Sequence, residues 1–206
     1  MKAVIRLAAA LVVLSCLACG TNARADVVYD NTGTMQPYYY NVGVELGDQV
    51  TLGGTARVVT TFDIILFSAV PTTTDLLGRF YANDGAGGVP GTLLWSGVLP
   101  NATVDQITVA TFDLSSLVPA VVVPDAFTWT VLPGSADVGP IMYDPPLVGS
   151  SADAFWAYDT AWGEYWFGGN PVANFGARIE ATPEPATLCL TGAGLAGFAA
   201  RRLRRK

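Results

Sequence analysis

The pattern of hydrophobic and polar positions divides this chain into three parts. Two apolar runs lie near the ends, at residues 7–17 and 188–200, and the long stretch between them lacks the spacing of an amphipathic helix. In that stretch, short β-branched and aromatic runs are separated by Gly, Pro, Asn and Asp. The pattern predicts a middle part that is built from short β-strands.

Seven candidate strands follow from these runs. They cover residues 49–52, 56–67, 79–82, 92–95, 108–112, 127–131 and 174–179, with turns expected at residues 53–54, 83–85, 89–91 and 133–134. In the run 56–67, the alternation of side-chain types is imperfect but nearer to a period of two than to 3.6. We therefore predict an all-β domain over residues 26–181, a single β-sandwich of jelly-roll-like form, without internal repeats.

The first apolar run has the features of an export signal. Lys2 and Arg6 give it a positive start, and the run is too short to span a membrane comfortably. Ala23 and Ala25 supply the small residues that a signal peptidase needs. Residues 1–25 are therefore predicted to be a signal peptide, followed by Asp26 as the first residue of the mature chain.

The cysteines leave a second interpretation of this segment open. Cys16 and Cys19 each follow a sequence that loosely resembles a lipobox, so lipidation is the alternative to ordinary cleavage. The third cysteine, Cys189, lies in the C-terminal apolar run. If both segments are removed, the mature body has no thiol, which excludes a disulfide and a cysteine nucleophile.

The second apolar run is framed by a proline motif and a basic end. Pro183-Glu184-Pro185 precedes it, and the end contains Arg201, Arg202, Arg204, Arg205 and Lys206. A helix over residues 186–200 would be about 22 Å long, short of a hydrocarbon core of about 30 Å, although arginine stems can reach outwards. The charges should keep this end cytoplasmic and the body outside. A plain anchor would explain the helix, but not the two prolines that fix an extended segment before it.

The order and spacing of the proline motif, the apolar run and the basic end resemble those of the PEP-CTERM sorting signal. The resemblance covers only residues 182–206 and implies an exosortase-type processing enzyme as a partner. It also implies that the protein is held in the inner membrane in transit and then reaches the cell surface or the extracellular matrix of an exopolysaccharide-producing bacterium.

Two stretches of the body are similar to exported choice-of-anchor β-sandwich domains. They are Gly47-Asp48-Gln49-Val50-Thr51-Leu52 with residues 56–59, and Phe80-Tyr81-Ala82-Asn83-Asp84-Gly85 with residues 90–95. The resemblance implies a β-sandwich and transfers no catalytic residue.

Charge limits the partners of the body. Residues 26–181 contain only Arg57, Arg79 and Arg178 as cations against sixteen acidic residues, a net charge of −13, whereas the whole chain has −6. Such a body should repel phosphates, so we exclude nucleic acid as a partner. The acidity is typical of a protein that stays soluble outside the cell.

The residue types that support most catalytic chemistry are missing from the sequence. The chain has no histidine, so it has no Ser-His-Asp triad and no histidine-bound zinc. It also lacks the nucleophile-elbow, phosphate-loop and dinucleotide motifs. A carboxylate-only glycoside hydrolase stays open in principle, because sequence does not give the separation of two acids. We expect no enzymatic activity.

An aromatic segment at residues 155–167 is the main candidate for binding. It holds seven aromatic side chains, including three of the five tryptophans. One interpretation is a sugar-binding platform made by Trp162 and Tyr165 with the acids Asp159 and Glu164, since flat rings stack on sugars. The other is a pair of strands that bury their aromatics in the core, with Gly163 at the turn.

Three further residues form a candidate calcium site. Asn83 and Asp84, with Asp48, could supply hard oxygen ligands, although the spacing is not that of an EF-hand and an Asn-Asp-Gly sequence is more often a simple turn. No other cofactor is expected. The sequence thus predicts an exported, non-enzymatic surface or matrix protein of structural or interaction type, and a carbohydrate-binding module for exopolysaccharide or environmental glycan is the alternative.

Overall fold

The computed structural model describes residues 24–184. The predicted signal peptide up to residue 23, Pro185, the apolar helix 186–200 and the basic end 201–206 lie outside the described residues. Within residues 24–184, there is no helix with the length and hydrophobicity needed to cross a membrane. The described part contains a 3₁₀ turn, η1 (Ala86–Gly88), and eleven strands: β1 (Asp26–Asp30), β2 (Met35–Tyr39), β3 (Glu45–Thr51), β4 (Val58–Ala82), β5 (Leu93–Asp113), β6 (Val121–Val122), β7 (Ala126–Pro133), β8 (Gly139–Tyr143), β9 (Ser150–Tyr158), β10 (Trp162–Tyr165) and β11 (Ala177–Thr182).

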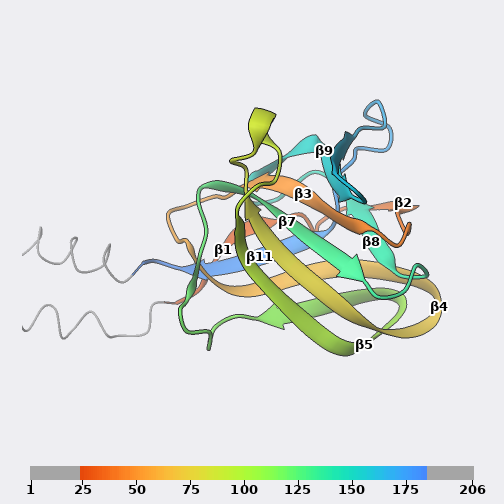
Figure 1. Cartoon of the computed structure of the whole chain (residues 1–206), viewed down its shortest axis with the longest axis horizontal. Helices are drawn as coiled ribbons and strands as arrows, with labels where there is room; N and C mark the ends of the chain where they lie inside the picture. Colours follow the sequence, from red (N-terminus) through yellow and green to blue (C-terminus); the bar gives the residue numbers. More distant parts are fainter. Residues whose placement is uncertain (1–23, 185–206) are drawn as a thin grey trace, which may run out of the picture.

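The strands form one antiparallel sheet that curls strongly around its own core, as a half-barrel (Figure 1). Its main path runs β1-β11-β4-β7-β3-β9-β10, while β5, β6 and β8 also pair with β4, and β2 pairs with β8. The predicted all-β class is confirmed. Strand β4 joins the two halves of the sheet, because it pairs with β11 near its start and with β7 near its end.

Strand β4 combines two strands that the sequence suggested were separate. The predicted runs 56–67 and 79–82 are both parts of its 25 residues, and Pro71 and Gly78 do not end it. Its register with β5 shifts between Ser68 and Thr72, and such an irregularity lets a long strand bend. A further shift in the pairing with β11 leaves Thr60 as an extra residue, which explains the imperfect alternation of this segment.

The core contains a group of packed aromatic side chains. Phe62, Phe80, Phe127, Trp129 and Phe155 are all fully buried, and the ring centroids of Phe80 lie 4.9 Å from Phe62 and 5.1 Å from Phe127. Burial of each such side chain contributes about 2–3 kcal/mol of hydrophobic stabilisation. A body without a disulfide is therefore held in part by the packing of rings from strands β4, β7 and β9.

One glycine in this sheet is required by a close approach of two backbones. A Cβ atom on Gly47 in β3 would lie 1.8 Å from the carbonyl oxygen of Trp129 in β7. Gly47 pairs with Thr130 on one side and with Trp156 on the other. Any other residue here would force β3 away from β7, and this would open the centre of the sheet.

The aromatic segment forms a β-hairpin, but its turn differs from the prediction. Strands β9 and β10 pair from Trp162–Tyr158 to Tyr165–Phe155, and residues 159–161 make the turn. The expected turn at Gly163 is wrong, since Gly163 pairs with Ala157 inside the hairpin. The turn consists of Asp159, Thr160 and Ala161. These short side chains can adopt a turn conformation, so glycine is not needed there.

Candidate functional site: an aromatic hairpin and the end of the last strand

The β9–β10 hairpin separates the predicted binding residues between its two faces. Successive side chains of a strand point to opposite faces, so Trp162 and Tyr165, three residues apart, do not lie together. Glu164 shares the face of Trp162 and is exposed, while Asp159 is exposed in the turn. The structure therefore brings together Trp162 and Glu164, and places Tyr165 on the opposite face.

On its own face, Trp162 is half-buried against two tyrosines. Its ring centroid lies 5.3 Å from that of Tyr81 in β4 and 5.0 Å from that of Tyr158 in β9. The contact joins the hairpin to the middle of the sheet. Trp162 is thus largely a packing residue, which leaves only part of its ring for a ligand.

A buried carboxylate, Glu45, lies beside Tyr81. It forms an ion pair with Arg79 and accepts hydrogen bonds from the hydroxyls of Tyr81, at 3.1 Å, and Thr130. Burial, followed by the negative charge of Glu45, raises the pKa of the Tyr81 hydroxyl to about 12. Both oxygens of Glu45 are engaged by donors, so this carboxylate connects β3 to β4 and β7.

The residue that follows β10 is the most exposed tryptophan of the described residues. Trp166, directly after β10, is 67% exposed, and its indole N–H donates to Asp153 at 3.0 Å. The other oxygen of Asp153 accepts from the backbone N–H of Ala173 at 2.7 Å. The carboxylate therefore fixes the ring of Trp166 while its surface faces solvent.

Two further aromatic side chains flank Trp166. Tyr165 stacks on Phe155 with an interplanar angle of 16° and a centroid distance of 5.4 Å, and Phe167 packs on the same ring at 5.5 Å. Both are more than one-third exposed. We call Tyr165, Trp166 and Phe167 the aromatic strip. The sequence marked the segment but not Trp166, because exposure depends on where β10 ends.

The residues of the weak calcium candidate lie in different environments. Asp48 is fully buried in β3 and accepts the backbone N–H of Phe175 at 2.6 Å. Asp84 is in an exposed turn, where hydrogen bonds from the hydroxyl and N–H of Thr92 lower the pKa of its carboxyl. Asn83 accepts a hydrogen bond from Thr128. Residues 24–184 contain no group of three or more Cys, His, Asp or Glu side chains arranged to hold a metal ion.

Asp48 belongs to a buried polar cluster in the core. The second oxygen of Asp48, the Tyr29 hydroxyl, the Asn31 side-chain carbonyl and the Ser151 hydroxyl are all buried without a well-formed hydrogen bond. Burial raises the pKa of Asp48 well above its usual value, an effect that the Phe175 N–H only partly opposes. Burial therefore favours the neutral form of the Asp48 carboxyl, because a charge at this position would be uncompensated in the core.

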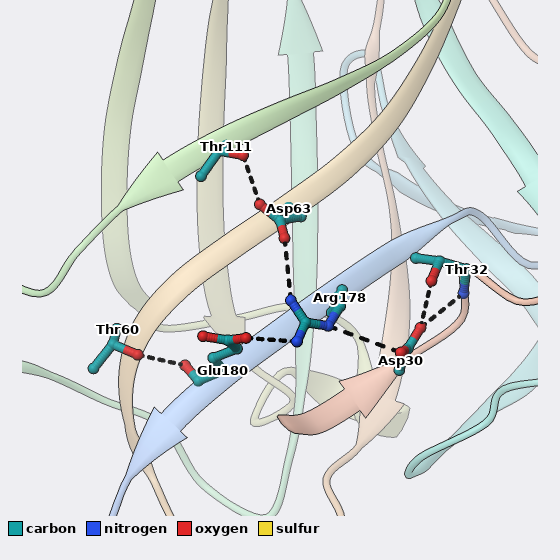
Figure 2. A network of polar contacts seen from close by, with 7 residues as sticks. All are labelled: Asp30, Thr32, Thr60, Asp63, Thr111, Arg178 and Glu180. Atoms are coloured by element: carbon teal, nitrogen blue, oxygen red, sulfur yellow. Dashed lines mark hydrogen bonds and ion pairs between the residues drawn. The ribbon is translucent and has the colours of Figure 1, made fainter. Parts of the chain in front are cut away.

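A charged network lies on the outer side of β1, β11 and β4 (Figure 2). The guanidinium of Arg178 is 2.6 Å from Glu180, 3.7 Å from Asp63 and 3.8 Å from Asp30. Asp63 also accepts from Thr111, and Asp30 from Thr32. One cation thus neutralises part of the charge of three carboxylates that come from three neighbouring strands.

The proline motif follows the sheet directly. Strand β11 ends at Thr182, whose carbonyl accepts the N–H of Arg57 at 3.2 Å, and Pro183 is the next residue. Pro183 and Glu184 are half-buried, and Pro185 lies outside the described residues. No spacer separates the folded sheet from the motif.

The fold and this site define a class of protein. It has a folded all-β domain that is followed, without a spacer, by a C-terminal proline motif. A family model for the PEP-CTERM protein-sorting motif matches residues 181–205, so this chain carries that motif. The motif implies an exported cell-surface protein that an exosortase processes. No curated protein and no solved structure matches the chain, so the similarity of the body to choice-of-anchor domains stays a prediction.

Proposed function

We propose that this protein is a non-enzymatic component of the cell surface or extracellular matrix, delivered by its tail and displayed through its β-domain. The observation that carries the proposal is the sorting motif, which begins where the last strand ends. As the finer description of the fold, we propose a jelly-roll-like sandwich. The two most buried carboxylates support a structural role, because Glu45 is engaged in an ion pair and Asp48 faces the core.

Fractionation of producing cells tests this proposal. The full chain is expressed in cells with and without the exosortase gene, and the body is followed in cytosol, membrane and surface fractions. The body should reach the surface only when the exosortase is present, and a variant with Pro183 and Pro185 changed to Ala should behave as if the enzyme were missing. A folded cytosolic protein with both ends intact would overturn the proposal.

A second candidate function is the binding of a neutral glycan by the aromatic strip. The supporting observation is the orientation of Trp166, whose open ring is fixed by Asp153, because a pre-fixed ring loses little conformational entropy on binding. Nearby acids, Asp153, Asp159 and Glu164, disfavour an acidic polysaccharide. This candidate shifts the expected platform from Trp162 to Trp166.

Binding of the purified protein to neutral and acidic polysaccharides tests the second candidate. Trp166→Ala should lower the affinity for a neutral polysaccharide at least about tenfold, as expected for a central aromatic residue. Leu147→Ala removes an exposed apolar side chain elsewhere and should have no effect. A wild type that binds neither polysaccharide, or that is unaffected by Trp166→Ala, would exclude this function.

A further inference from the structure

Strand β5 has a free edge. It pairs with β4 over its whole length, from Leu93–Tyr81 to Asp113–Thr61, and within residues 24–184 no strand pairs with its other side. At the margin of the curled sheet, β4 and β5 form the long curved pair in Figure 1. The backbone N–H and C=O groups on the outer side of β5 are therefore available for another strand.

The first part of this edge is protected against pairing. Pro100 lacks an N–H group, and Asn101 and Gln106 both have a φ of 52°, which breaks the extended backbone. Asp105 adds a charge between them. Proteins use these features to keep edge strands from joining other chains.

The second part of the edge has none of these features. From Ile107 to Asp113 the register with β4 is continuous, and before Asp113 the segment has no charge, Pro or Gly. Its outward side chains include Ile107, 48% exposed, and Val109, 56% exposed. We call residues 107–113 the open edge.

From this contrast we infer that the open edge pairs with the open edge of a second copy of this chain. Two antiparallel copies related by a twofold axis at Ala110 use all seven residues. Gln106, with its positive φ, bounds the segment on one side, and the turn held by Asp113 and Ser115 bounds it on the other.

The charges of the open edge agree with a second copy as the partner. In this register Val109 lies opposite Thr111, and Ile107 lies opposite Asp113, so the two Asp113 side chains do not face each other. β-branched pairs such as Val–Thr stabilise antiparallel ladders. The segment has no basic residue that would select an acidic partner.

The oligomeric state of the full chain in detergent tests this inference. Sedimentation over a concentration series should show a monomer–dimer equilibrium for the wild type. Val109→Lys should raise the dimer dissociation constant at least about tenfold, since a lysine would stand against the partner strand. The matched control is Val98→Lys, because Val98 is 58% exposed on the same strand but lies before Pro100; this variant should dimerise like the wild type.

Two results would overturn the inference: a wild type that stays monomeric at every concentration, or equal weakening by Val98→Lys and Val109→Lys. Far-UV circular dichroism and melting temperature must match between the two variants, so that misfolding is not mistaken for dissociation. If Val109→Lys fails this check, Ile107→Lys replaces it. Sorting of the protein does not depend on the outcome, so this test is independent of the proposed function.

Discussion

Asp26 and Ala181 lie opposite each other in the β1–β11 ladder. The first residue of the predicted mature chain is therefore a direct neighbour of the strand that leads to the sorting motif. One residue later, the carbonyl of Thr182 is still held by the N–H of Arg57. The last strand is thus hydrogen-bonded up to the residue before Pro183. The first and last residues of the β-domain lie side by side at one edge of the ladder.

This arrangement predicts that processing of the tail is limited by access. A spacer of four Gly-Ser residues between Thr182 and Pro183 should speed the conversion of precursor to processed protein, because the enzyme would no longer approach against the sheet. Pulse-chase labelling measures the rate. The same spacer between Gly87 and Gly88, in an exposed turn, is the control and should leave the rate unchanged. An equal or slower rate with the tail spacer would contradict the prediction.

The buried Asp48 predicts that stability decreases as pH rises. Its pKa is raised in the folded state, so above about pH 4 the unfolded chain has lost a proton that the folded chain keeps. The free energy of unfolding should fall from that pH until the folded-state pKa is passed. Asp48→Asn keeps the site neutral and should be more stable than the wild type by about 1–3 kcal/mol at pH 8.

Urea denaturation at pH 4, 6 and 8 measures this difference. The gap between Asp48→Asn and wild type should shrink towards pH 4, because the carboxyl of the unfolded chain is then about half protonated and the folded chain keeps its proton. Asp105→Asn, at an exposed position, controls for the loss of one negative charge. The prediction would be contradicted if Asp48→Asn lowered the free energy of unfolding by the same amount at every pH. The Asp48 carboxyl would then stabilise the fold through its hydrogen bond with the Phe175 N–H.

The ion pair of Glu45 predicts a large difference between a buried and an exposed acid. Glu45→Ala leaves Arg79 without its carboxylate and removes the acceptor of Tyr81, so it should lower the free energy of unfolding by about 2–3 kcal/mol. Asp125→Ala breaks the ion pair with Arg57, but Asp125 is 85% exposed, and the cost should be below about 1 kcal/mol. Chemical denaturation measures the free energy of unfolding of both variants. Equal losses for Glu45→Ala and Asp125→Ala would refute the prediction.

The network around Arg178 predicts a salt-dependent variant. Arg178→Met keeps the apolar stem but leaves Asp30, Asp63 and Glu180 close together without a cation. The free energy of unfolding should fall by about 1 kcal/mol at low ionic strength and recover in about 1 M salt, where the Debye length is about 3 Å. Arg178→Lys, which keeps the charge, should show a smaller loss. A salt-independent loss would mean that packing of the guanidinium, and not its charge, matters here.

The strand content could be predicted from side-chain patterns, but the lengths of the strands could not. The runs 56–67 and 79–82 were predicted as two separate strands, and residues 68–78 were assigned to neither. In the structure, β5 accompanies β4 along its whole length, and long-range hydrogen bonding of this kind overrides local propensity. The strong curl of the sheet is associated with this single long strand, which runs through both of its halves.

The candidate site depended on the position of a turn. With a turn at Gly163, Trp162 and Tyr165 would have stood on either side of it; with the turn at residues 159–161, they share β10 and face opposite ways. A shift of a few residues thus exchanges the members of a surface. The pairing of Glu45 with Arg79, which are 34 residues apart, had no local signal at all.

The position of β11 between β1 and β4 also determines how the body would bear mechanical load (Figure 1). A pull on Thr182 that is opposed at the far end of the sheet would act along the axis of β11, and the hydrogen bonds to both neighbouring strands are perpendicular to that axis. These bonds are therefore loaded in shear and share the force, so they do not break one after another as in a peeled hairpin. Under such a load, the two ladders that hold β11 would resist extraction of the last strand together.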